Sequence, residues 1–196
     1  ELSRLTVRQY HNTVADLIAS FRGRGPNVDA RRGLRGEYFH GRTFDRKDLV
    51  FERIDPQVDF FFGVEGPDPE RFEPNRFAIR WAGSIVPPET GIYEFVIRTE
   101  HSAKLALNTA WYEPPLIDAS VKSGDDTEYR ASLMLLGGRA YPLRLEFSKA
   151  NQGVDNKKHE PFANASIELL WKPPHGVLEP VPERVLTPHD SPQVFV

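Results

Sequence analysis

Between residues 77 and 171, apolar side chains recur at every second position in one short stretch after another. Successive side chains of a strand point to opposite faces, so this alternation gives each strand one buried and one wet face, as in antiparallel sheets. The chain also has 17 Pro and 14 Gly without a period, which indicates many turns. Short strands separated by such turns predict an all-β sandwich or barrel. The predicted strands cover 35–39, 77–81, 93–97, 104–107, 130–136, 143–147 and 167–171.

The length of the chain allows one large domain with its own core. A domain of 196 residues buries roughly 70% of the surface of its unfolded form and folds without a disulfide or a metal. There is no cysteine, which excludes thiol catalysis and cysteine-based zinc, iron–sulfur and haem-attachment sites from this chain. Trp81 and Trp171 alternate with apolar neighbours and are expected in the core.

The charge of the chain disfavours nucleic acid as a partner. The formal net charge is −3 and the pI is about 6.1, whereas nucleic-acid binders usually carry a basic stripe. The arginine-containing stretch 22–35 has no aromatic residues interleaved for base stacking, so it is interpreted as a solvated linker. No apolar run approaches the roughly 20 residues that a membrane span needs, and no span is expected.

The first residues follow a different period. Over 3–21, apolar residues recur at helical spacing and predict a short N-terminal α-helix, which Gly23 and Pro26 would end. Its apolar stripe needs a partner surface, either in this domain or in a neighbouring one. The stripe consists of Leu5, Tyr10, Val14, Leu17, Ile18 and Phe21.

Several motifs occur in an order that resembles one known family, the PA14 (protective-antigen type) domain. They are L-R-G-E-Y-F at 34–39, R-I-D-P-Q-V-D-F-F-F-G at 53–63, F-A-I-R-W-A-G-S-I at 77–85, P-P-E-T-G-I-Y-E-F at 87–95, G-R-A-Y-P-L-R-L-E-F at 138–147 and I-E-L-L-W at 167–171. The resemblance implies an antiparallel β-sandwich over 33–188, followed by a tail at 189–196. Residues 1–32 resemble the end of a small helical domain of unknown function, found before PA14 in large exported bacterial proteins. A periplasmic, cell-surface or secreted location is therefore expected.

The resemblance also implies where calcium would bind. Sugar-binding PA14 members hold Ca²⁺ with two adjacent aspartates joined by a cis peptide, and the matching positions here are Glu100 and His101. Glu100 would still offer a carboxylate, but the nitrogen of His101 suits a hard cation poorly. Asn108 matches a later aspartate of the family. The favoured interpretation is a solvent-exposed Glu100–His101 pair in a β-turn, with calcium on Glu100 as the alternative.

Two further stretches are candidate ligand-binding loops. Trp111 and Tyr112, in a loop flanked by prolines, would stack on a sugar ring or else cover the edge of the sandwich. The polar stretch 149–161 contains Asn151, Asp155 and Asn156. These side chains would form a second recognition loop or bind calcium, although such a run is more often a solvated hairpin tip.

The sequence shows no catalytic apparatus. No two of the six histidines are spaced in the sequence as the ligands of a metal site would be, and there is no Gly-x-Ser-x-Gly motif. Together with this, the resemblance to PA14 implies a non-catalytic carbohydrate-binding or adhesion module of a larger exported bacterial protein. Its partners would be a glycan or polysaccharide and the neighbouring domains of the same chain. Two alternatives stay open: an interaction or spacer domain with a decayed calcium and sugar site, and an accessory domain to a neighbouring enzyme.

Overall fold

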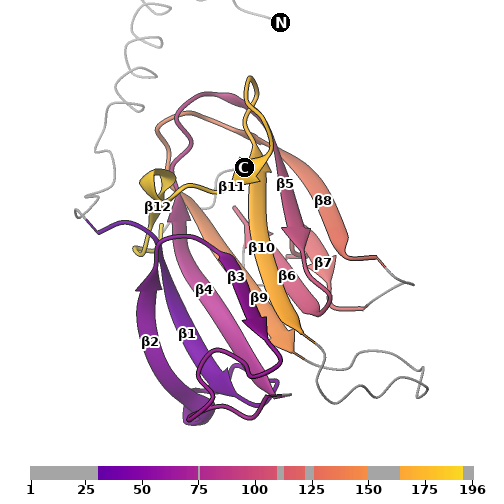
Figure 1. The fold of residues 1–196 in the computed structure, drawn as a ribbon. Helices are drawn as coiled ribbons and strands as arrows, with labels where there is room; N and C mark the ends of the chain where they lie inside the picture. The colour runs from indigo at the N-terminus through magenta and orange to yellow at the C-terminus, as the bar shows by residue number, and fades with distance from the viewer. Residues whose placement is uncertain (1–30, 75, 110–112, 122–125, 150–163, 192–196) are drawn as a thin grey trace, which may run out of the picture.

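The computed structural model describes residues 31–74, 76–109, 113–121, 126–149 and 164–191. The helix predicted over 3–21 lies outside these residues. Within them, all sheet pairings are antiparallel and form two stacked sheets (Figure 1). The predicted all-β, antiparallel sandwich is confirmed. No helix in the described parts of the chain is long and apolar enough to cross a membrane.

The larger sheet has seven strands, in the order β2-β1-β4-β9-β6-β7, with β12 paired to β4. Its long central pair, β4 and β9, runs in continuous register over nine residues. The strands are β1 (Leu34–His40), β2 (Leu49–Asp55), β4 (Phe77–Ile85), β6 (Ser102–Leu107), β7 (Ile117–Ala119), β9 (Tyr141–Lys149) and β12 (Leu186–Thr187). A short 3-10 turn, η1 (Arg46–Asp48), precedes β2.

The smaller sheet has five strands, in the order β11-β10-β5-β8, with β3 paired to β10. The strands are β3 (Asp59–Gly63), β5 (Gly91–Arg98), β8 (Glu128–Leu135), β10 (Ala165–Lys172) and β11 (Glu179–Pro180). A second 3-10 turn, η2 (Glu183–Val185), leads from this sheet back to β12 in the larger one. The C-terminal part of the described chain therefore closes against both sheets.

The core lies between the sheets and is rich in aromatic rings. Trp81 and Trp171 are both fully buried, as the alternation predicts. Trp171 stacks on Tyr93 with ring centroids 5.1 Å apart, and Trp81 stacks on Phe60 at 5.6 Å. The first contact joins two neighbouring strands of the smaller sheet, β10 and β5, and the second joins β4 of the larger sheet to β3 of the smaller one, so inward-facing rings pack within and between the two sheets.

A buried carboxylate ties three strands of the larger sheet together. Asp55 Oδ2 accepts hydrogen bonds from Tyr38 Oη and Trp81 Nε1, each at 2.7 Å. Asp55 Oδ1 accepts one from Arg53 Nε at 2.6 Å, and Arg53 also donates to Tyr38 Oη at 2.7 Å. Burial, followed by the charge of Asp55, raises the pKa of the Tyr38 phenol far above its ordinary value. The network fixes the end of β2 against β1 and β4.

A second buried charge has no carboxylate partner among the described residues. Lys149 is only 3% exposed, its Nζ donates to the backbone oxygen of Val64 at 3.3 Å, and it lies 6.0 Å from the ring centre of Phe77. Burial lowers the pKa of its ammonium group below the ordinary value. The folded chain therefore binds this proton less tightly than the unfolded chain does.

We expect Lys149→Met to raise the free energy of unfolding at pH 7 by about 1 kcal/mol, because the substitution removes a charge that folding desolvates. The lowered pKa gives the sign of a second effect. The contribution of Lys149 to the free energy of unfolding of the wild type should become more favourable with rising pH. This change falls between the lowered pKa of the folded chain and the higher pKa of the unfolded chain. Urea unfolding of both proteins at pH 7 and pH 10 measures both effects. A loss of stability in the variant at pH 7 would show that the bond to Val64 outweighs desolvation.

Candidate functional site

The turn between β5 and β6 is the place where the sequence predicts calcium binding. Thr99 is buried, and its backbone N–H donates to the oxygen of Thr127 at 2.9 Å. Its hydroxyl donates to the oxygen of Ser166 at 2.8 Å and accepts from the backbone N–H of His101 at 3.0 Å. The turn is therefore held by hydrogen bonds to main-chain groups of the smaller sheet.

His101 is part of the core wall, and its predicted exposure is wrong. The residue is 6% exposed, and its ring packs edge-on against Phe147 with centroids 6.1 Å apart. Its Nε2 donates to the backbone oxygen of Asn164 at 2.9 Å, since a carbonyl oxygen only accepts. The packing of β9 and the start of β10 around the turn causes this burial. Only Glu100 of the predicted pair is exposed.

Asn108 lies at the opposite end of β6 from Glu100, so the two side chains cannot bind one ion. The strand between them has six residues and spans about 17 Å at the usual rise of a β-strand. Asn108 has φ 53°, in the left-handed region that asparagine tolerates, and its N–H donates to the oxygen of Pro142 at 2.9 Å. Asn108 therefore makes a turn at the far end of β6, and its assignment as a ligand-binding residue stays a prediction.

The remaining predicted ligand-binding residues lie outside the described part of the chain. They are Trp111 and Tyr112 in one loop and Asn151, Asp155 and Asn156 in another. Within the described residues, no group of three or more His, Asp or Glu side chains is arranged to hold a metal ion. The described geometry thus brings none of the predicted ligands together around Glu100.

Sequence reasoning missed a row of charged residues across the outer face of the larger sheet. The register places Glu37, Arg80, Glu146 and Lys104 side by side on β1, β4, β9 and β6. Arg80 binds Glu146 at 3.1 Å and Glu37 at 3.5 Å. At the far side of the row, Lys104 contacts Asp118 of β7 at 3.5 Å. Each strand contributes one residue to the row, and the row forms only when the strands are paired.

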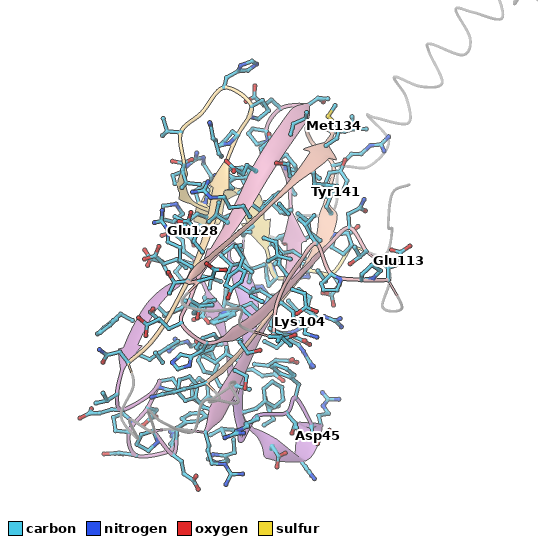
Figure 2. All side chains as sticks on the ribbon, turned by 90° about the vertical axis from the view of Figure 1, so that its right-hand side faces the viewer. Asp45, Lys104, Glu113, Glu128, Met134 and Tyr141 are labelled. Carbon is cyan, nitrogen blue, oxygen red and sulfur yellow. The ribbon has the colours of Figure 1, made fainter. Side chains whose placement is uncertain are left out.

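Two clefts lie on this face, on either side of the charged row. The first has a volume of about 250 Å³ and lies beside Phe44, Lys104 and Ser148. The second has a volume of about 430 Å³ and lies beside Arg35, Arg80 and Arg144. Figure 2 views the edge of the sandwich, with Lys104 of the larger sheet and Glu128 of the smaller sheet on different layers. Residues of the charged row line both clefts, which places the clefts on the outer face of the larger sheet.

The PA14 domain family matches residues 30–184, which is most of the chain. The chain belongs to the PA14 domain family. A curated relative of this PA14 domain is the anti-sigma-I factor RsgI3 of Acetivibrio thermocellus, 29% identical over 160 residues. That alignment covers 82% of this chain but 22% of the relative. The PA14 domain thus matches only a part of a much longer protein.

Solved structures of several kinds share the fold of this PA14 domain. One is an anti-sigma factor domain-containing protein, with 28% identity, a TM-score of 0.68, and coverage of 84% of this chain and 50% of that one. Another is the A domain of epithelial adhesin 6 from Candida glabrata, solved in complex with Galb1-3GlcNAc. It has 14% identity and a TM-score of 0.60, and the match covers 86% of this chain and 92% of the adhesin domain.

Calcium titration of the PA14 domain should give superimposable calorimetric curves for the wild type and Glu100→Ala. Glu100 is the one exposed carboxylate of its turn, and Ca²⁺ needs six to eight oxygen ligands. The bonds of Thr99 and His101 hold the turn without an ion. A heat of binding in the wild type that disappears in the variant would restore this turn as a calcium site.

Proposed function

We propose that this PA14 domain is a non-catalytic carbohydrate-binding module of a longer, exported protein. The observation that carries the proposal is a shared fold over almost the whole length of sugar-binding domains. The match covers 92% of the epithelial adhesin 6 domain solved with Galb1-3GlcNAc. It also covers 91% of a related adhesin domain solved with beta-lactose, with a TM-score of 0.61 and 12% identity. The match to longer anti-sigma factor chains supports a place among other domains.

Sugar binding would not use a calcium ion at the β5–β6 turn. That turn offers the Glu100 carboxylate alone, because the ring of His101 is buried and bonded to Asn164. Recognition then depends on direct hydrogen bonds and on contact with apolar surface. Such a site needs neither a metal ion nor a cis peptide at the turn.

A glycan array probed with the labelled domain, with and without a chelator, tests this function. We expect a defined set of glycans to bind in both conditions, and Glu100→Ala to bind the same set. Binding that the chelator abolishes would contradict the calcium-free mode. An array with no bound glycan would contradict the function itself and leave an interaction or spacer domain. Fractionation of cells that produce the full-length protein tests export, which a purely cytoplasmic location would contradict.

A further inference from the structure

We propose that the outer face of the larger sheet is the glycan-binding surface of this domain, and that its ligand is an anionic glycan carrying carboxylate or sulfate groups. This inference rests on the proposed function and assigns a surface and a ligand class to it. The surface consists of the two clefts and the charged row between them. It is distinct from the β5–β6 turn, which lies at the end of the sandwich.

The clefts carry more cationic than anionic side chains. Their lining contains five basic residues, Arg35, Arg42, Arg80, Lys104 and Arg144. It contains three acidic residues, Glu37, Glu146 and Asp190. The whole chain has a formal net charge of −3, so this face departs from the rest of the protein. A third cleft, at the loop end of the sandwich, has equal numbers of both signs: Arg42, Arg71 and Arg76 with Asp48, Glu70 and Glu73.

The more exposed charged side chains on this face include four cations and two anions: Arg35, Arg42, Lys104 and Arg144 against Asp118 and Asp190. The carboxylates of Glu37 and Glu146 are each 19% exposed, and both bind Arg80. The side chains of Lys104 and Arg144 are 44% and 47% exposed. Lys104 contacts the exposed carboxylate of Asp118, and an exposed pair of this kind contributes little free energy. An anionic group of a ligand can therefore displace Asp118 and bind the Lys104 ammonium.

The first cleft also has apolar and hydroxyl groups suited to a sugar ring. Phe44 borders it, and the ring of Phe44 is held between Phe39 at 5.7 Å and the guanidinium of Arg80 at 4.6 Å. Ser148 is buried, with 7% of its surface exposed, and its hydroxyl lacks a hydrogen-bond partner in the described structure. Buried polar groups normally have partners, and a hydroxyl group of a bound sugar would supply the one that Ser148 lacks.

The shape of the surface fits one sugar unit in each cleft. A cleft of about 250 Å³ is smaller than the roughly 300–1,000 Å³ of sites for drug-sized ligands. The second cleft, of about 430 Å³, lies further along the same strands. Since both clefts are built on strands of one sheet, their side chains are pre-organised, which lowers the entropic cost of binding. A short stretch of polysaccharide would cross the charged row between them.

Affinity measurements on a charge-matched pair of double variants test the surface. Lys104→Gln with Arg144→Gln removes two cations from the proposed face, where they are 44% and 47% exposed. Arg98→Gln with Arg130→Gln removes two equally exposed cations, at 44% and 46%, from the outer face of the smaller sheet. The net charge changes equally in both. The probes are polygalacturonate for carboxylates, dextran sulfate for sulfates, and dextran as the neutral glycan.

We expect the wild type to bind polygalacturonate or dextran sulfate, more weakly as salt rises, and not dextran. The Lys104/Arg144 variant should lose about tenfold or more in affinity, and the Arg98/Arg130 variant less than about threefold. Which anionic probe binds identifies the charged group. Equal losses in the two variants, or equal binding to dextran, would overturn the proposal. If the Lys104/Arg144 variant still binds the glycans that the wild type binds on the array, the proposed surface is wrong but the proposed function stands. An array on which the wild type binds no glycan refutes the function.

Ser148→Ala separates a binding role from a structural one. Because the hydroxyl lacks a partner, its removal should leave the melting temperature unchanged or slightly higher. The affinity for the anionic probe should nevertheless fall about threefold or more, because the ligand loses one hydrogen bond. Unchanged affinity would remove Ser148 from the surface. A lowered melting temperature would show that the hydroxyl has a structural role.

Discussion

Replacing Asp55 by alanine is expected to lower the free energy of unfolding by about 3–5 kcal/mol, the range for breaking a buried charge network. The carboxylate accepts hydrogen bonds from Tyr38, Trp81 and Arg53, all at 2.6–2.7 Å. Without it, the hydroxyl of Tyr38 and the indole N–H of Trp81 have no acceptor in a closed core. Arg53 also loses the charge that compensates its own. A single substitution thus leaves two buried donors, and a guanidinium that is 45% exposed, without their acceptor.

Urea unfolding followed by tryptophan fluorescence measures this loss. Tyr38→Phe is the matched control, because it deletes one hydroxyl of the network and keeps the ring and the carboxylate. That hydroxyl donates to Asp55 and accepts from Arg53, so we expect a cost of about 1–2 kcal/mol, the usual value of two hydrogen bonds. A loss for Asp55→Ala no larger than that for Tyr38→Phe would show that water enters the site and replaces the carboxylate.

The hydrogen-bond network of Asp55 also requires a glycine at position 36. A Cβ atom at position 36 would lie 2.4 Å from Asp55 Oδ2 and 3.2 Å from the indole nitrogen of Trp81. The glycine therefore leaves the space into which the carboxylate fits. Gly36 and Tyr38 are on β1, Asp55 on β2 and Trp81 on β4. The PA14 motifs at 34–39, 53–63 and 77–85 thus meet at one buried group, a relation that pairing of the strands creates.

The sheets could be predicted from the sequence because alternation is a local property. The alternation in the stretch 77–81 already assigns Trp81 and Arg80 to opposite faces of a strand. In the structure, Trp81 is buried and Arg80 is partly exposed. The position of Asn108 could also have been predicted. Seven residues separate it from Glu100, and six of them form an extended strand, so one ion cannot bind both.

The burial of His101 and the charged row could not be predicted in this way. The partner of His101, Asn164, is 63 positions away in the sequence. The partners Arg80 and Glu146 are 66 positions apart. Neither contact follows from local periodicity, because each depends on which strands pair and in which register. A histidine after a strand therefore looks like an exposed turn residue, although the turn is packed against β9 and β10.

The C-terminal part of the described chain depends on a glycine in the same way. Gly83, on β4, faces β12 and has φ 155°. A Cβ atom there would lie 2.2 Å from the backbone oxygen of Thr187 and 3.0 Å from Cδ2 of Leu34. The neighbouring Ser84 hydroxyl donates to the oxygen of His189 at 2.7 Å, so the tail is bonded beside this contact. Backbone occupies the space that a side chain at position 83 would need.

Gly83→Ala is therefore expected to lower the free energy of unfolding by about 2–4 kcal/mol, because the methyl group must displace β12 or distort β4. Gly138→Ala is the matched control. Gly138 has φ 76°, but a Cβ atom there meets nothing within 4 Å. It should cost about 1–2 kcal/mol from backbone conformation alone. Thermal unfolding of both variants separates the cost of the backbone conformation from the cost of the steric clash with β12. Equal losses would show that β12 moves away at little cost, and that the tail contributes little to holding the larger sheet.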